Sequence, residues 1–328
     1  MASAPRELRL GTRGSQLALW QAHAVAARIA ERGGPGCRMV IIKTTGDRLQ
    51  EAPLSEVGGK RLFVKEIEDA LLRRDIDLAV HSSKDMPAIL PDGLTIAAVL
   101  PREDPLDAVV LPAFRVRLKP DTTYELKPLE DLAAALGPSP VVGTGSVRRV
   151  AQLRRLLPGA RFDAIRGNLD TRLRKLDEGR YDALVLAAAG LRRLGFGSRI
   201  SLALPAAACV PAPGQGIVAI EIREDNDEVR NAVTAIDDIE TSSALNAERA
   251  LVVALGGGCQ TPIGALASAT SNDEIELIAA VVSLDGARAV RGRGRGARCE
   301  AAALGTRVGA QLIADGADEI LAEARTGD

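Results

Sequence analysis

The sequence predicts an α/β protein built from two similar domains, followed by a smaller α+β domain. Three observations lead to this fold class. Short apolar runs alternate with amphipathic helical segments over the first two thirds of the chain. A glycine-rich turn that leads into a helix occurs twice in that part. The last 90 or so residues do not continue the alternation, and the 328 residues suffice for two or three domain cores.

The first segment begins with a short strand at residues 8–11 and a helix at 16–31. Ser15 is placed to cap that helix, because its side chain can accept a hydrogen bond from the first helical turn. The alternation of strands and helices predicts a mostly parallel sheet. The elements that continue it are a strand at 38–43, a helix at 63–74 and a strand at 76–80.

The second segment repeats this scheme. Gly143-Thr144-Gly145-Ser146 precedes a helix that runs through Leu157, as Gly11-Thr12-Arg13-Gly14-Ser15 precedes the first helix. The repetition indicates an internal duplication into two α/β lobes. We expect ligands to bind outside the carboxyl ends of the strands, in a cleft between the lobes. The remaining expected elements are a strand at 162–165, a helix at 169–178 and a strand at 183–186.

The third region has a different pattern. It contains a capped helix at 241–255, a hairpin around Asp285-Gly286 and helical runs between residues 300 and 324. The proline-rich stretch 114–140 has the composition of an inter-domain connection, with an insert near 114–126, and 205–216 that of a segment crossing back to the first lobe. The expected domains are therefore residues 1–101 with 217–236, residues 102–216, and residues 237–328.

Composition excludes several classes of function. The net charge of −1 provides no field for nucleic acid or membranes, and 2% aromatic residues provide few stacking surfaces for bases. Two histidines and four widely spaced cysteines make a structural zinc or a disulfide framework unlikely, so we expect no metal. The first ten residues lack the apolar core of a signal peptide, and no apolar run reaches membrane-spanning length. We expect a cytoplasmic protein and find nothing that requires an oligomer.

One cysteine lies in an unusual setting. Cys259 follows three consecutive glycines at 256–258, just after the third-domain helix. Glycines allow backbone conformations that other residues avoid, so this loop can turn the sulfur outward. Most isolated cysteines are small buried apolar residues, which is the simpler interpretation. An exposed thiol on a loop of this kind would instead indicate a special role, such as that of a reactive group.

Arginines gather where predicted strands end and helices begin. One interpretation is that these side chains belong to solvated helix faces. The other is that they add cationic groups to helix N-termini that already favour anions, which would indicate a ligand with several carboxylates or phosphates. Asp85 follows the strand ending at Val80, beside Lys84, where a carboxylate could transfer protons or stabilise a developing cation, although an aspartate before a proline is also common in turns. The arginines concerned are Arg13, Arg148, Arg149, Arg166, Arg172 and Arg193.

Taken together, the motifs resemble those of the porphobilinogen deaminase (hydroxymethylbilane synthase) family, from about residue 6 to about residue 324. One departure is Gly145, where the family more often has serine or asparagine. The motifs that carry the resemblance are Gly11–Ala22, Val57–Glu66, Ala79–Pro87, Gly143–Arg149, Arg166–Asn168, Leu186–Leu191, Pro213–Gly216 and Gly257–Gln260.

The resemblance implies two domains similar to type II periplasmic binding proteins and a small C-terminal domain. It implies a transferase of tetrapyrrole and haem biosynthesis, which joins four porphobilinogens into the linear tetrapyrrole hydroxymethylbilane with loss of ammonia. It also implies a dipyrromethane cofactor attached to Cys259 through a thioether. No metal or nucleotide is required.

The resemblance also implies roles for single residues. Asp85 and Lys84 would be catalytic, with Asp85 stabilising the cation formed as ammonia leaves. The substrate porphobilinogen would be bound by Arg13, Ser15, Arg166, Arg172, Arg193 and Gln215. The cofactor would be bound by Ser82, Lys84, Asp85, Thr144, Ser146, Arg148, Arg149 and Arg172.

Two other functions would explain part of the sequence. A cytosolic two-lobed carboxylate-binding or sensor protein would explain the lobes and the arginines, but it leaves the cysteine loop unexplained. A nucleotide-dependent enzyme lacks its loops, because Gly58-Gly59-Lys60-Arg61 and Gly143-Thr144-Gly145 do not complete a phosphate-binding motif.

Overall fold

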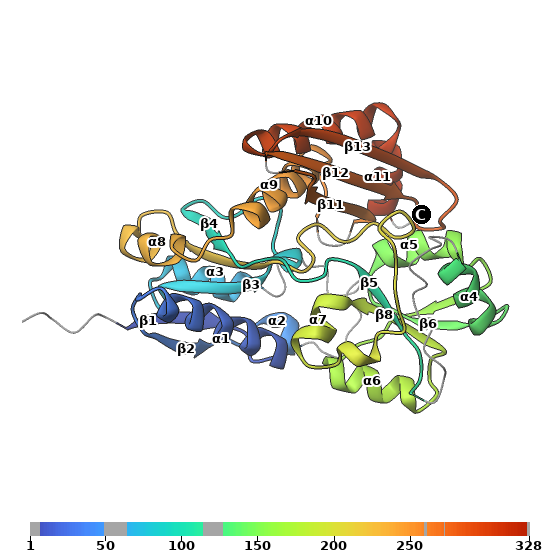
Figure 1. Ribbon diagram of the computed structural model, residues 1–328, viewed down its shortest axis with the longest axis horizontal. Coiled ribbons are helices and arrows are strands. Elements are labelled where there is room, and N and C mark those ends of the chain that lie inside the picture. The colour runs from blue at the N-terminus through green and yellow to red at the C-terminus, as the bar shows by residue number, and fades with distance from the viewer. Residues whose placement is uncertain (1–6, 49–63, 114–126, 259–260, 272, 327–328) are drawn as a thin grey trace, which may run out of the picture. The chain divides into compact units, whose positions relative to one another are not determined.

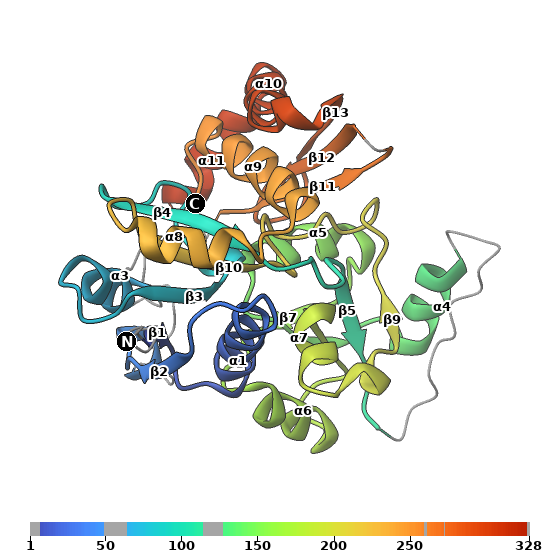
Figure 2. The same ribbon diagram turned by 60° about the vertical axis from the view of Figure 1, so that its left-hand side comes forward.

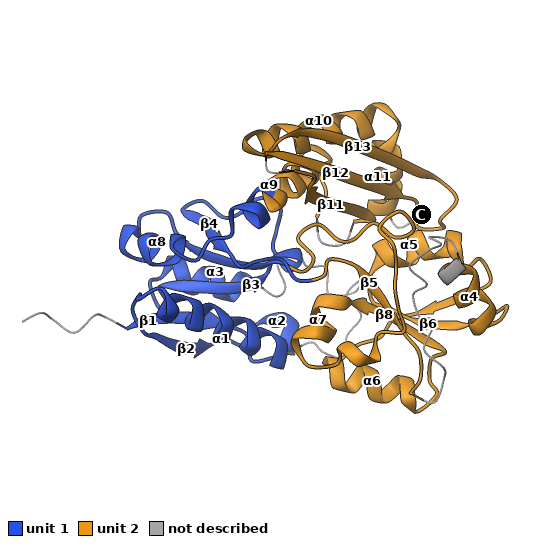
Figure 3. Ribbon diagram, in the orientation of Figure 1, with its two compact units in different colours: residues 1–103, 217–243 blue, residues 104–216, 244–328 orange. Residues whose placement is uncertain are grey.

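The computed structural model describes residues 7–48, 64–113, 127–258, 261–271 and 273–326 (Figure 1). The chain separates into two compact units, which are coloured separately in Figure 3. The first unit contains residues 1–103 and 217–243, and the second contains 104–216 and 244–328. The three-domain boundaries expected from the sequence stay a prediction.

The first unit is built on a five-stranded sheet of order β2-β1-β3-β10-β4. Strand β1 is parallel to β2 and to β3, whereas β10 runs antiparallel to both of its neighbours, β3 and β4. The strands are β1 (Leu8–Thr12), β2 (Cys37–Ile41), β3 (Leu78–Ser82), β4 (Leu94–Val99) and β10 (Val218–Arg223).

Helices cover both faces of this sheet. On one face, Val25 and Ile29 of α1 and Val233 of α8 pack against buried residues of β1, β3 and β10. On the other face, Ile67 and Leu71 of α3 pack against Ala79 of β3. The helices of this unit are α1 (Gln16–Glu31), the short α2 (Thr45–Arg48), α3 (Lys65–Leu72) and α8 (Asp227–Thr234).

The second unit contains a sheet of the same design, of order β7-β6-β8-β5-β9. Strand β6 is parallel to β7 and to β8, and β5 runs antiparallel to β8 and to β9. Position by position this repeats the first sheet, so the predicted pair of similar α/β domains is confirmed. The strands are β5 (Asp107–Val110), β6 (Val141–Gly143), β7 (Arg161–Asp163), β8 (Ala183–Ala187) and β9 (Leu202–Ala203).

Part of the predicted inter-domain connection at 114–140 is a helix, which corrects that interpretation. Helix α4 (Lys127–Leu136) packs Leu129, Leu132 and Leu136 against the core of the second sheet. These leucines have helical spacing, but the charges and prolines around them obscured the pattern. The predicted insert at 114–126 lies outside the described residues. The other helices here are α5 (Val147–Leu156), α6 (Leu169–Asp177) and α7 (Ala188–Arg193), with a 3₁₀ turn η2 (Gly197–Arg199).

The C-terminal part of the second unit is a three-stranded antiparallel sheet covered by helices (Figure 2). The predicted hairpin at Asp285-Gly286 joins β12 to β13. Glycines 292 and 294 of β13 face helix α10, where an added methyl group would lie within 3.1 Å of Val308. Residues 244–254 of α9 (Ile239–Ala254) belong to this unit. The other elements are β11 (Ile263–Ala269), β12 (Glu274–Val282), β13 (Ala289–Ala297), η3 (Arg298–Glu300), α10 (Ala301–Ala314) and α11 (Ala317–Thr326).

Helix α5 is held between two sheets of the second unit. Its Leu153 belongs to the core of the β5–β9 sheet, whereas Ala151 packs against Ala280 and Val282 of β12. At the end of the helix, Arg154 donates a 2.7 Å hydrogen bond to the Leu284 carbonyl in the β12–β13 turn. The helix that begins with the predicted ligand-binding arginines is therefore anchored along its length.

Candidate active site

In each unit the predicted site residues gather where parallel strands end. In the first unit β1 and β3 lie side by side, and Arg13 follows the former while Ser82 ends the latter. In the second unit the neighbouring strands β7, β6 and β8 lead to the other arginines and hydroxyl groups. This edge is where open α/β sheets bind their ligands.

Ser15 and Arg13 begin the first helix. Ser15 caps α1, because its side chain accepts a 3.3 Å hydrogen bond from the Ala18 backbone N–H. Arg13 pairs with Asp47 of α2, with 3.1 Å between Nε and Oδ1. Burial alone would raise the pKa of Asp47, but the Arg13 pair and hydrogen bonds from Thr44 outweigh it and lower that pKa.

The segment Ser82–Asp85 continues β3 into the 3₁₀ turn η1 (Ser83–Asp85). The Ser82 hydroxyl accepts a 3.4 Å hydrogen bond from Gln21, whereas the buried Ser83 hydroxyl has no hydrogen-bond partner among the described residues. Lys84 and Asp85 are half-buried. No described residue donates a hydrogen bond to the Asp85 carboxylate, so this carboxylate is available to a ligand.

The corresponding turn of the second unit leads into α5. Ser146 caps this helix by accepting a hydrogen bond from the Arg149 backbone N–H. Thr144 is buried, and its backbone N–H donates to the Asp163 carbonyl of β7. Gly145 is exposed, and an added methyl group would come no closer than 3.5 Å, to the Ile165 carbonyl, so a larger residue would fit.

Arg148 and Arg149 are buried and share one carboxylate, that of Asp107. Arg148 Nη1 lies 2.7 Å from Asp107 Oδ2, and Arg149 Nε lies 2.8 Å from Oδ1. Burial alone would raise the pKa of Asp107, but the two guanidinium groups outweigh it and hold that pKa far below its usual value. The two predicted cofactor ligands are therefore fixed in position by a third residue.

The four other predicted site residues of this unit differ in their surroundings. Arg172 Nε donates to the Gly167 carbonyl at 2.8 Å, and Arg193 Nη2 donates to the Gly216 carbonyl at 2.7 Å. Arg166 is half-buried, and the structure gives its guanidinium no partner among the described residues. Gln215 is fully buried and donates to Asp107 Oδ1 at 2.9 Å.

Cys259 lies outside the described residues, but the glycines before it are described. Gly256 has a φ of 59° and ends α9 in the left-handed conformation that glycine favours. Gly257 packs closely, because an added methyl group would lie 2.3 Å from Ile263 Cδ1. Apart from its chain neighbours, no described residue comes within 4 Å of a methyl group added at Gly258. The first two glycines thus shape the turn that leads to the cysteine.

Sequence reasoning missed Asp107, Asp47 and Ser83. A signal for Asp107 was present, since a carboxylate at the start of an otherwise apolar strand requires a buried partner. Asp47 and Ser83 carry no such local signal. Their importance depends on what the fold places beside them.

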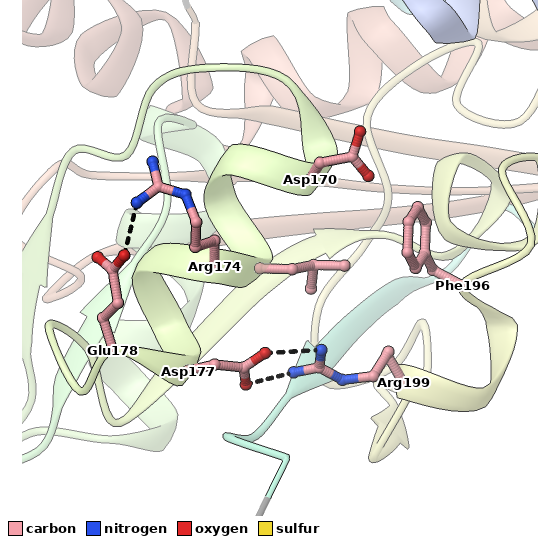
Figure 4. Close-up of a pocket in the computed structure, with 7 residues that line it drawn as sticks. Asp170, Arg174, Asp177, Glu178, Phe196 and Arg199 are labelled. Carbon is pink, nitrogen blue, oxygen red and sulfur yellow. Dashed lines mark hydrogen bonds and ion pairs between the residues drawn. The ribbon is translucent and has the colours of Figure 1, made fainter.

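A pocket of about 460 Å³ lies away from these residues, along α6 and η2 (Figure 4). Four of its charged side chains pair with one another, Asp177 with Arg199 and Arg174 with Glu178. Asp177 also accepts a hydrogen bond from the Ala113 backbone. None of the predicted site residues lines this pocket.

The described residues also differ from what metal sites and membrane-spanning helices require. Within the described ranges, no three His, Cys, Asp or Glu side chains come together as a possible metal site. None of the helices in these ranges combines the length and the apolar character needed to cross a bilayer.

Comparison with protein families gives two adjoining matches. Residues 8–231 match the model of "Porphobilinogen deaminase, dipyromethane cofactor binding domain". Residues 243–314 match that of "Porphobilinogen deaminase, C-terminal domain". Together the two models span most of the chain.

Curated relatives match over nearly the full length. The chain is 46% identical to porphobilinogen deaminase from Syntrophobacter fumaroxidans, over 97% of this chain and 98% of that protein. It is 43% identical to the protein of that name from Geotalea daltonii, over 97% of this chain and 95% of that protein. Among solved structures, immunogenic lipoprotein A from Vibrio vulnificus aligns with 14% identity and a TM-score of 0.43, over 72% of this chain and 97% of the other.

Proposed function

The chain belongs to the porphobilinogen deaminase family, and we propose that Cys259, Asp85 and the strand-end arginines carry out its reaction. It is a transferase, a hydroxymethylbilane synthase, which joins four porphobilinogens into the linear tetrapyrrole. One observation supports the assignment of residues best. Both sheets present arginines, hydroxyls or the Asp85 carboxylate at the ends of their parallel strands.

The residues present fit a dipyrromethane cofactor, which carries carboxylate side chains. Arg148 Nε is a buried donor that has no acceptor among the described residues, and the buried Ser83 hydroxyl also lacks a partner. Ser82, Lys84, Asp85, Thr144, Ser146, Arg148, Arg149 and Arg172 would hold the group. When bound to Cys259, it supplies the pyrrole carbon to which the first substrate is joined.

Porphobilinogen carries an acetate and a propionate, so each addition brings two more carboxylates. Arginine binds carboxylates through two parallel hydrogen bonds, which fixes their orientation as well as their charge. We assign substrate binding to Arg13, Ser15, Arg166, Arg172, Arg193 and Gln215. Arg166 supports this assignment best, because its half-buried guanidinium has no described partner.

Asp85 is the residue we assign to the chemical step. Loss of ammonia leaves a positive charge on the substrate, and a fixed carboxylate stabilises such a charge better than mobile water does. Its oxygens would accept hydrogen bonds from pyrrole N–H groups. Lys84 would balance the charge of the substrate carboxylates beside it.

The proposal extends to a cytoplasmic monomer that binds no nucleic acid. Few aromatic residues and a net charge of −1 support the last part. Four widely spaced cysteines support a reducing compartment.

Intact-mass measurement tests the function directly. We expect the purified protein to carry an adduct of the mass of a dipyrromethane, and Cys259→Ser to lack both the adduct and activity. Cys299→Ser is the matched control, because Cys299 is exposed and lies in η3. A protein without adduct, whose Cys259→Ser variant behaves like the wild type, would instead favour a carboxylate-binding protein.

A further inference from the structure

Asp107 occupies the ligand-binding edge of the second sheet although it belongs to an antiparallel strand. It is the first residue of β5 and pairs with Ala187, the last residue of the parallel strand β8. Because β5 runs antiparallel to β8, its beginning lies beside the carboxyl end of β8, a strand that is itself parallel to β6. The side chain of Asp107 is fully buried at that place.

Its two oxygens orient the two arginines separately. Oδ2 accepts from Arg148 Nη1, which also donates to the Val210 carbonyl at 2.7 Å. Oδ1 accepts from Arg149 Nε, while Arg149 Nη1 donates to the Val185 carbonyl at 3.0 Å. Each guanidinium is thus held by hydrogen bonds to two or more groups, which fix the conformation of the arginine side chain.

Two neutral groups complete this cluster. Gln215 donates to Asp107 Oδ1 and its side-chain carbonyl accepts from Arg149 Nη2 at 3.3 Å. The Cys209 thiol donates to Oδ2 at 3.3 Å, and burial, with the nearby Asp107 charge, raises the pKa of Cys209 to about 12. Cys209 is therefore neutral at physiological pH and adds no charge.

In the described contacts of the cluster, one carboxylate pairs with two guanidinium groups, so one positive charge has no counter-ion of its own. A buried positive charge without a counter-ion is unfavourable, so an incoming carboxylate would be stabilised there. Arg148 Nε, buried and without a described acceptor, is a donor that such a carboxylate can use.

We propose that Asp107 is a positioning residue that orients Arg148 and Arg149 toward one carboxylate of the bound pyrrole chain. This inference rests on the proposed function, since it takes the ligand of the two arginines to be a pyrrole carboxylate. Asp107 itself touches no ligand. It acts through the two arginines, with Gln215 holding the other side of the pair.

The sign of the effect distinguishes positioning from simple electrostatics. Asp107→Asn removes the negative charge, so an effect of charge alone would strengthen carboxylate binding and enlarge the gain in Tm on loading. Loss of positioning would instead reduce that gain. Asp107→Glu keeps the charge but lengthens the side chain in a fully buried site. An effect of this variant on carboxylate binding would therefore come from lost positioning and not from lost charge.

The experiment compares wild type, Asp107→Asn and Asp107→Glu, each prepared without cofactor and then loaded with porphobilinogen. We expect both variants to lose more than half of the rise in Tm that loading gives the wild type, because the two arginines no longer hold the carboxylate of the bound group. A rise in Tm equal to or larger than that of the wild type would overturn the proposal, because a merely structural residue lowers both Tm values equally.

Gln215→Leu provides a second test if the Asp107 variants do not fold. It keeps the charges of the cluster but removes the amide that contacts Asp107 and Arg149, and we expect a smaller loss of the gain in Tm on loading. KM is not used for this variant, because Gln215 is itself assigned to substrate binding, and a wild-type gain in Tm would contradict the proposal. The wild type serves as the reference for function: if it forms neither adduct nor hydroxymethylbilane, the proposed function fails and not this inference alone.

Discussion

The Glu248 carboxylate accepts a 2.6 Å hydrogen bond from the backbone N–H of Gly214. Its other oxygen accepts from the Ala267 backbone N–H of β11 at 2.8 Å. Glu248 lies on α9 and is fully buried. One side chain thus joins the Pro213–Gly216 motif to the C-terminal sheet, directly beside Gln215.

We expect Glu248→Gln to destabilise the protein by about 1–3 kcal/mol, because an amide replaces one of the two acceptor oxygens with a donor. The backbone N–H that faces the new NH₂ group would then be buried without a partner. Urea unfolding measures the change. Glu240→Gln, on the exposed face of the same helix, should leave the free energy of unfolding unchanged. Equal stability of the two variants would contradict this prediction.

Replacement of Asp85 should separate folding from catalysis. We expect Asp85→Ala to keep the thermal stability of the wild type and to reduce hydroxymethylbilane formation by about 100- to 1000-fold or more, because the charge that develops as ammonia leaves loses its stabilising carboxylate. A kinetic assay of product formation, with circular dichroism for folding, checks both parts. Asp92→Asn removes an exposed carboxylate of the same unit and should have no effect. Full activity in Asp85→Ala would remove this residue from the mechanism.

The cysteines should differ sharply in reactivity, because the thiolate is the reactive form. Burial raises the pKa of Cys209 to about 12, and burial with the charge of Glu7 raises that of Cys37 to about 11. At pH 8 we expect a maleimide to label exposed Cys299 first and Cys209 only after unfolding. Peptide mapping by mass spectrometry identifies the labelled sites.

The state of Cys259 is a separate readout of the same labelling experiment. We expect it to react in protein prepared without cofactor and to be blocked in loaded protein, since a thioether has no free thiol. Labelling of Cys259 in loaded protein would argue against its role as the attachment point. Early labelling of Cys209 in folded protein would contradict the buried environment described above.

Much of the fold could be predicted because the signals are local. Ser15 and Ser146 each precede a helix that they cap, as expected from their positions. The repeated strand, glycine-rich turn and helix predicted the duplication that the two sheet orders confirm. The ends of these elements also place most of the candidate residues where parallel strands end.

The residues that hold the site could not be predicted in the same way. Asp107 and Arg148 are 41 positions apart, and Arg13 and Asp47 are 34 apart. No local pattern connects such pairs, because only the packing of separate strands brings them together. A loop arginine therefore predicts an anion, but it does not reveal whether that anion is a ligand or a carboxylate of the protein itself.

The pair between Arg13 and Asp47 predicts a dependence of stability on pH. Because the pKa of Asp47 is lower in the folded protein, the unfolded chain binds more protons in acid, and the contribution of the pair is lost as the pH falls through the folded pKa. It is fully present above about pH 5, well above the ordinary aspartate pKa. We expect Asp47→Asn to be less stable than the wild type at pH 7 and the difference to shrink toward zero below about pH 4. Urea unfolding of both proteins, at pH values about one unit apart between about pH 3 and pH 7, measures the difference in the free energy of unfolding. A difference that stays constant over this range would show that the carboxylate charge of Asp47 does not stabilise the fold.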